Sequence, residues 1–120
     1  MPHYLAEVAY TPQAWEALMK NPQDRIEMVK KPIEKLGGKA EVFYFAFGDH
    51  DVVGIIEMPD NVSAAAIAIA FAGGGACKSV KTTPLMTAAE SIEALKRAAS
   101  CGYKAVTSGK AAGKAAGSGR

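Results

Sequence analysis

The sequence predicts an α+β fold of the ferredoxin-like kind: an antiparallel β-α-β-β-α-β sheet with helices on one face, a C-terminal helix, and assembly as a dimeric α+β barrel. Two observations predict the fold, namely the order of strand-like and helix-like segments and the tight Gly48-Asp49 turn between two of the strands. A third observation, the apolar character of both sheet faces, predicts the assembly.

The strand-like segments are short runs in which apolar residues recur with a period of two, bounded by turn residues. The clearest is Lys39 to Phe47, where phenylalanine occupies every second position from 43 to 47. The Gly48-Asp49 turn joins it to the next strand. The four predicted strands span residues 3–10, 39–47, 50–58 and 76–83.

The helix-like segments begin at capping residues. Thr11-Pro12 and Asn21-Pro22 predict two helix starts, and Pro32 predicts a kink or break within the second helix. Alternating Ala and Ile residues in 62–72 could also indicate a strand, but the alanine content and the preceding cap favour a helix. The Thr87–Glu90 capping box predicts the start of the last helix, which we expect to run to about residue 99.

Charge is distributed unevenly along the 120 residues, which are enough for one domain. Residues 1–99 contain ten basic and twelve acidic side chains, a net charge of −2, whereas residues 100–120 contain four basic and no acidic ones. The acidic balance argues against nucleic-acid binding, except weakly through the basic end. The Lys-Ala-Ala-Gly repeat in 109–117 has no side chain that could anchor it to a core. We therefore expect one ferredoxin-like domain over residues 1–99 and a disordered basic tail over residues 100–120.

Cysteine usage and hydropathy predict a cytoplasmic protein without membrane association. Cys77 and Cys101 form no CxxC pair, so we expect free thiols in a reducing compartment, with a structural disulfide as the alternative. The N-terminus lacks the basic and apolar regions of a secretory signal, and the longest apolar run, residues 62–72, is too short to span a bilayer. No Cys/His cluster occurs, so we expect no metal site and no cofactor.

Both faces of the predicted sheet are apolar. We assign the face with the smaller residues to the helices, namely Tyr4, Ala6, Val8 and Tyr10, then Val42, Tyr44 and Ala46, then Val52, Gly54, Ile56 and Met58. A sheet covered on one side should be polar on the other, and a large apolar patch exceeds what monomers usually expose. We therefore expect a homodimer or higher oligomer that packs sheet against sheet. The predicted interface consists of six apolar side chains, namely Leu5, Phe43, Phe45, Phe47, Val53 and Ile55.

Ionisable side chains on or next to that second face are the candidate ligand-binding residues: His3, Glu7, His50, Asp51 and Glu57. Carboxylates between two sheets cost free energy unless they are paired or hydrated. They therefore either ring a solvent-filled cavity for a small molecule or remain hydrated at the rim. Asp51 could orient the His50 imidazole as a general base, although adjacent strand residues point to opposite faces. The alternative is a hairpin in which Asp51 accepts backbone N–H groups.

The stretch from Gly37 to Asp60 resembles the GYD-domain family of small bacterial and archaeal proteins. The matching residues are Gly37-Gly38-Lys39, Phe43-Tyr44, the Gly-x-x-Asp-Val-Val hairpin of 48–53, and Glu57-Met58-Pro59-Asp60. The resemblance extends roughly from Tyr4 to Ala98. Where the family pattern usually has a tyrosine before the hairpin aspartate, this chain has His50. The resemblance implies a ferredoxin-like fold and self-association, and no settled activity.

Three functions follow as alternatives. The first is a homo-oligomeric domain that binds a small, mostly apolar molecule in the cavity between the sheets of its subunits. The second is a small cofactor-free enzyme, of isomerase or oxygenase type, with Glu7 or Glu57 as the base and His3 or His50 assisting. The third is a regulatory or structural module whose basic tail docks on an acidic partner.

Overall fold

The computed structural model describes residues 1–106, and the chain divides into two compact units, Met1–Met86 and Thr87–Arg120. The predicted tail begins inside the second unit, and its residues 107–120, which include the whole Lys-Ala-Ala-Gly repeat, lie outside the described part. The predicted division of the chain at residue 99 stays a prediction.

The first unit contains one four-stranded sheet in which every neighbouring pair is antiparallel. The strand order is β2-β3-β1-β4, which places β1 and β3 in the centre. The strands are β1 (His3–Tyr10), β2 (Lys39–Phe45), β3 (Val52–Glu57) and β4 (Cys77–Leu85). The predicted α+β class is confirmed, and the arrangement is consistent with a ferredoxin-like fold. Strand β4 continues past its predicted end through Pro84, which is tolerated because β4 is an edge strand.

Four helices complete the described chain: α1 (Pro12–Lys20), α2 (Arg25–Lys35), α3 (Asn61–Gly73) and α4 (Ala88–Ser100). The helix favoured over a strand at 62–72 is confirmed as α3. Two details of α2 were predicted wrongly. Its N-cap is Asp24, whose carboxylate accepts the Glu27 N–H at 3.0 Å, and not Asn21. The helix also continues through Pro32 without a break, since the following turn forms and Ile33 is fully buried.

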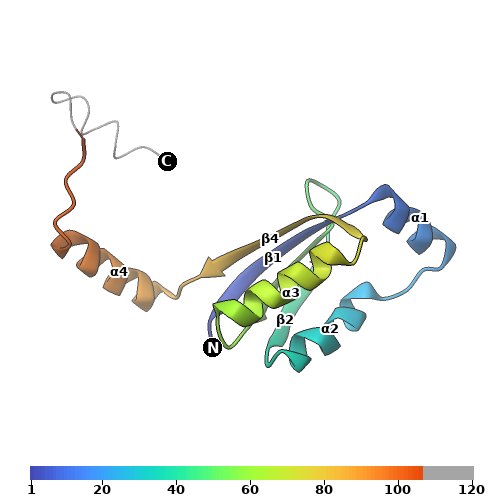
Figure 1. The fold of residues 1–120 in the computed structure, drawn as a ribbon, viewed down its shortest axis with the longest axis horizontal. Helices are drawn as coiled ribbons and strands as arrows, with labels where there is room; N and C mark the ends of the chain where they lie inside the picture. The colour runs from blue at the N-terminus through green and yellow to red at the C-terminus, as the bar shows by residue number, and fades with distance from the viewer. Residues whose placement is uncertain (107–120) are drawn as a thin grey trace. The chain divides into compact units, whose positions relative to one another are not determined.

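The core of the first unit lies between the sheet and its helices (Figure 1). Tyr4 and Ile56 from the central strands meet Ile33 of α2 and Ile67 of α3, and Met58 is also fully buried. Helix α1 packs on the same side, where Ala14 and Leu18 contact the cluster of Val8, Tyr10 and Val52. We call this the helix side of the sheet. The predicted helix-facing residues of β1 and β3 are therefore confirmed.

Strand β2 contains an extra residue that reverses its faces. Ala40 is opposite Ile56, but Val42 is opposite Ile55, so Glu41 has no partner of its own in β3. Such a β-bulge shifts the side-chain alternation by one residue. Val42 and Tyr44 consequently point away from the helices, whereas Phe43 packs into the helix-side core.

The structure changes the placement of three predicted interface residues. The placement of Phe43 and Phe45 on the face away from the helices is wrong, because they lie opposite Gly54 and Val52, which belong to the helix side. Phe47 lies beyond the end of β2 in the connection to β3, where its side chain is fully exposed. It therefore belongs to neither face of the sheet.

The second unit begins with α4, whose predicted capping box is confirmed. The Thr87 hydroxyl accepts the Glu90 N–H at 3.1 Å, and the Glu90 carboxylate accepts the Thr87 N–H at 2.8 Å. Residues 102–106 form no regular element. None of the helices within residues 1–106 is long and apolar enough to cross a membrane.

Candidate functional site

The side of the sheet away from α1, α2 and α3 contains most of the predicted site residues, and we call it the open face. It is formed by His3, Leu5, Glu7, Val42, Tyr44, Val53, Ile55 and Glu57, together with Lys81 of β4, which lies opposite Glu7. Opposite residues of an antiparallel pair share a face, and the register sets Leu5 against Ile55 and Glu7 against Val53. The placement of Leu5, Val53 and Ile55 away from the helices is confirmed. Val42 and Tyr44 were missed because the bulge is not visible in the alternation.

The centre of the open face is apolar and its two ends are polar. Leu5, Val53 and Ile55 are half-buried, while Val42 is 39% and Tyr44 66% exposed. The polar groups divide into a His3 cluster at one end and a pair formed by His50 and Glu7 at the other. The sheet therefore offers an apolar surface between two ionisable groups.

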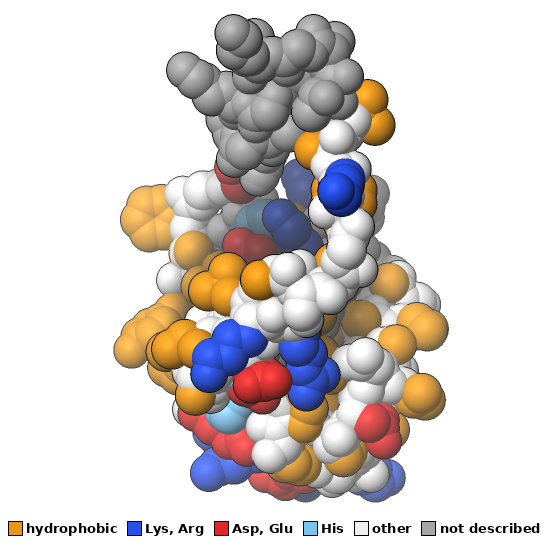
Figure 2. Space-filling view, turned by 90° about the vertical axis from the view of Figure 1, so that its left-hand side faces the viewer, with side chains coloured by type: hydrophobic (Ala, Val, Ile, Leu, Met, Phe, Trp, Pro, Cys, Tyr) orange, Lys and Arg blue, Asp and Glu red, His pale blue; other side chains and the backbone are white. Residues whose placement is uncertain are grey.

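The His3 cluster contains one imidazole and two carboxylates. His3 Nε2 lies 3.3 Å from Glu41 Oε2 and 3.7 Å from Glu57 Oε2. Figure 2 shows acidic side chains directly beside a histidine at the surface. The bulge places Glu41 beside His3 and Glu57. The sequence pattern did not predict this position, since it showed only a charged residue within an apolar strand. One ligand atom from each residue lies within 4.8 Å of the other two, so together they could hold a cation. A protonated His3 would supply the same compensating charge.

The pKa of the Glu41 carboxyl is lowered. The main cause is a hydrogen bond with the Glu57 side chain, which is opposed by partial desolvation and reinforced by the hydrogen bond and charge of His3. The lowered pKa keeps the Glu41 carboxyl ionised at neutral pH, so a carboxylate lies beside the His3 imidazole at the edge of the apolar surface.

At the other end of the open face, His50 Nδ1 lies 3.6 Å from Glu7 Oε2, and both side chains are about one-quarter exposed at 24% and 22%. The sequence named both residues but did not pair them, because one lies in the β2–β3 connection and the other in β1. The pairing depends on the strand order, which places β1 directly beside β3.

Asp51, in the connection between β2 and β3, is hydrogen-bonded to the backbone of β1. Its carboxylate accepts the Tyr10 backbone N–H at 2.8 Å, and its own N–H donates to the Val8 carbonyl at 2.7 Å. These bonds match the alternative in which Asp51 accepts a backbone N–H group. The structure therefore brings His50 together with Glu7, and it occupies Asp51 with the backbone of β1.

The fold and the open face define a class: an antiparallel α+β domain with helices on one side of the sheet and an apolar, acid- and histidine-bordered surface on the other. The family model described as the GYD domain matches residues 4–95. The chain belongs to the GYD-domain family, as the residues from Gly37 to Asp60 predicted. A comparison with curated proteins found no match.

Proposed function

We propose that this protein is a homo-oligomeric binding domain, in which the open faces of two copies enclose a small, mostly apolar molecule. The supporting observation is the apolar centre of the open face, where Leu5 and Ile55 lie opposite each other between two polar ends. A continuous apolar surface of this kind is rarely left in water by a single chain. The polar ends supply hydrogen-bonding groups that would fix the orientation of a bound molecule.

A second copy fits this surface better than an unrelated partner because the open face bears both signs of charge. Lys81 of β4 lies opposite Glu7 in the register, so a base and an acid occur on neighbouring strands. Two copies related by a two-fold axis present the same patch to each other. Lys81 of one copy can then face an acidic residue of the other, which satisfies both charges.

A second candidate function is a small cofactor-free enzyme of isomerase or oxygenase type. The observation that favours it is the pairing of each predicted base with a predicted histidine: Glu7 with His50 at 3.6 Å, and Glu57 with His3 at 3.7 Å. A carboxylate beside an imidazole can move a proton to and from a bound molecule. The third alternative, docking through the basic tail, falls mainly on residues outside the described part and stays a hypothesis.

Two neighbouring residues of β2 provide a matched test of the oligomer. Tyr44 and Phe45 are 66% and 48% exposed and lie on opposite sides of the sheet. We expect Tyr44→Glu to convert the oligomer to a monomer in light scattering and native mass spectrometry. We expect Phe45→Glu to leave the oligomer intact. A wild-type chain that is monomeric at millimolar concentration, or an oligomer broken only by Phe45→Glu, would show that the open face is not the interface.

The bound molecule is tested separately, by native mass spectrometry of the protein purified from its own host. Retention of a small molecule by the wild type, and its loss with Tyr44→Glu, supports binding between the copies. An oligomer that retains no molecule contradicts the binding part and leaves the assembly. The retained molecule is then the probe for catalysis: if Glu7→Gln or Glu57→Gln binds it but no longer converts it, the enzyme alternative is supported. An unchanged molecule after incubation with the wild type contradicts that alternative.

A further inference from the structure

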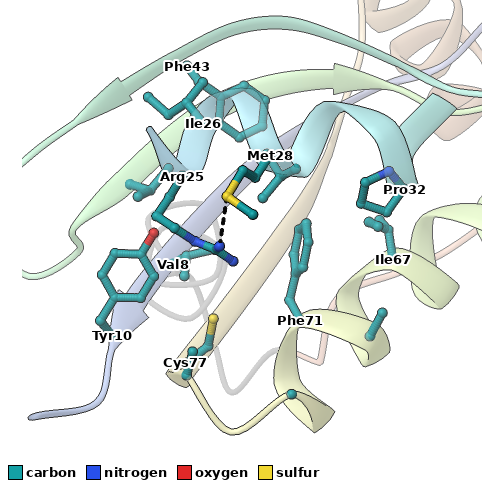
Figure 3. Close-up of a pocket in the computed structure, with 15 residues that line it drawn as sticks. Val8, Tyr10, Arg25, Ile26, Met28, Pro32, Phe43, Ile67, Phe71 and Cys77 are labelled. Carbon is teal, nitrogen blue, oxygen red and sulfur yellow. Dashed lines mark hydrogen bonds between the residues drawn. The ribbon is translucent and has the colours of Figure 1, made fainter. Parts of the chain in front are cut away.

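A separate cavity lies on the helix side of the sheet, between the strands and helices α2 and α3 (Figure 3). Its volume is about 320 Å³, at the small end of the range typical of sites for small organic molecules. Most of its wall is apolar and comes from every strand of the sheet and both helices. The apolar side chains of the wall include Val8, Ile26, Val29, Phe43, Ile67 and Phe71. The cavity is on the opposite side of the sheet from the open face.

One cationic side chain is part of this apolar wall. Arg25, the first residue of α2, is half-buried, and its guanidinium points into the space between Tyr10 and Met28 (Figure 3). Its contacts are with neutral groups: Nη1 lies 3.2 Å from Gln23 Oε1 and 3.2 Å from Met28 Sδ. Among the described residues that line the cavity none is acidic, and no ion pair within residues 1–106 includes Arg25.

Tyr10 adds a hydroxyl next to the guanidinium. Burial raises the pKa of the Tyr10 phenol, an effect that the nearby charge of Arg25 opposes and that of Asp51 reinforces. The hydroxyl is therefore protonated at neutral pH and can donate a hydrogen bond. Asp51, whose charge acts on the Tyr10 phenol, is already bonded to the Tyr10 backbone N–H at 2.8 Å. The Arg25 guanidinium and the Tyr10 hydroxyl are thus two hydrogen-bond donors that face the cavity, and none of the described residues that line it supplies an anion to accept from them.

We propose that this cavity binds an apolar monocarboxylate, with its hydrocarbon part among the side chains of the wall and its carboxylate on Arg25 and Tyr10. A guanidinium has five N–H donors arranged to hold a carboxylate with two parallel hydrogen bonds. The apolar surroundings strengthen that charge pair, because they lower the local dielectric constant. At about 30 Å³ for each water-sized group, the cavity accommodates a ligand of roughly ten non-hydrogen atoms. Octanoate has this size and is the probe.

The test compares octanoate with octanol, which has the same chain and no charge, by calorimetry and amide chemical-shift mapping on the full-length protein. We expect octanoate to shift the amide signals of Val8 and Phe71 and to bind at least tenfold more tightly than octanol. Arg25→Gln should lower the octanoate affinity at least tenfold and change the octanol affinity less than twofold. Lys31→Gln is the matched control, because Lys31 is exposed on the same helix and does not line the cavity.

A second variant tests the position of the hydrocarbon part. Ala70 of α3 lines the cavity, so Ala70→Leu should fill part of it and weaken octanoate and octanol alike. Absence of octanoate binding to the wild type would overturn the proposal. Equal losses with Arg25→Gln and Lys31→Gln would also overturn it, because they would indicate attraction by net charge alone. Shifts confined to Leu5 and Ile55 would place the ligand on the open face and overturn it as well. The result is independent of the oligomer test, since neither Tyr44 nor Phe45 lines the cavity.

Discussion

Replacing Gly54 by alanine tests the packing that positions both sides of the sheet. Gly54 lies in the central strand β3, opposite Phe43 of β2. A methyl group built on Gly54 would lie 2.7 Å from Phe43 Cγ and 2.6 Å from the Val42 carbonyl oxygen. Non-bonded carbon atoms are at their optimum separation at about 3.5–4.0 Å. The ring of Phe43 and the backbone of β2 would therefore have to move by about 1 Å, and the core against which Phe43 packs resists that movement.

The expected cost follows from this overlap. Overfilling a well-packed site destabilises a protein by about 1–3 kcal/mol. Alanine in place of glycine within a strand gains only about 0.5–1 kcal/mol from the unfolded chain, so the overlap decides the sign. We expect Gly54→Ala to lower the free energy of unfolding by about 1–2 kcal/mol. For a unit of this size the melting temperature would fall by about 10 °C.

Urea unfolding followed by Trp15 fluorescence and circular dichroism measures this change. Gly73→Ala is the control, because a methyl group on Gly73 at the end of α3 has no atom within 4 Å. We expect this variant to be as stable as the wild type or up to about 1 kcal/mol more stable. If Gly54→Ala is as stable as the wild type, or if Gly73→Ala loses as much, then the close approach of Phe43 to β3 does not have the energetic weight assigned to it.

Three further outcomes are expected. The hydrogen bond from the α3 backbone lowers the pKa of Asp60 below its usual 3.8, so its stabilising contribution is present above pH 3.8 and is lost as the pH falls through the lower folded-state value. Asp60→Asn should therefore flatten the decline of the urea midpoint below pH 3.8, and an unchanged pH profile would contradict this. Ile33→Ala, at a fully buried position, should lower the free energy of unfolding by about 2–5 kcal/mol. Val62→Ala, at a position that is 79% exposed, should lower it by less than about 0.5 kcal/mol. Equal losses of the two variants in urea unfolding would refute the core assignment. Burial raises the pKa of the Cys77 thiol, so iodoacetamide should alkylate it more slowly than the exposed Cys101, and mass spectrometry that found equal rates would oppose this.

The sequence alone was sufficient where a feature depends on residues close together in the chain. Alternation with a period of two identified the strands and the correct faces of β1 and β3, so Leu5 and Ile55 were placed correctly. The alanine-rich segment and its N-cap identified α3, and the Thr87 capping box identified α4. The motif between Gly37 and Asp60 was enough to identify the family. These features are encoded in local conformational preference, which acts within a few residues.

The candidate site was less predictable, because it depends on which strands pair and in what register. The sequence named His50 and Glu7, but only the pairing of β1 with β3 brings them together. The cavity beside Arg25 also forms only when α2 and α3 pack on the sheet. Neither feature has a local pattern, because the contacting residues are far apart in the chain.

The bulge at Glu41 shows most clearly the difference between what local sequence determines and what strand pairing determines. Alternation along β2 is a local property, and counting from Ala40 assigns Val42 and Tyr44 to the helix side. Insertion of one unpaired residue is a property of the pairing between β2 and β3, and it exchanges the two faces from that point onward. The sequence determined that β2 is an apolar strand with large side chains on both faces. Only the tertiary structure decided which of those side chains face the core, because that choice depends on the partner strand.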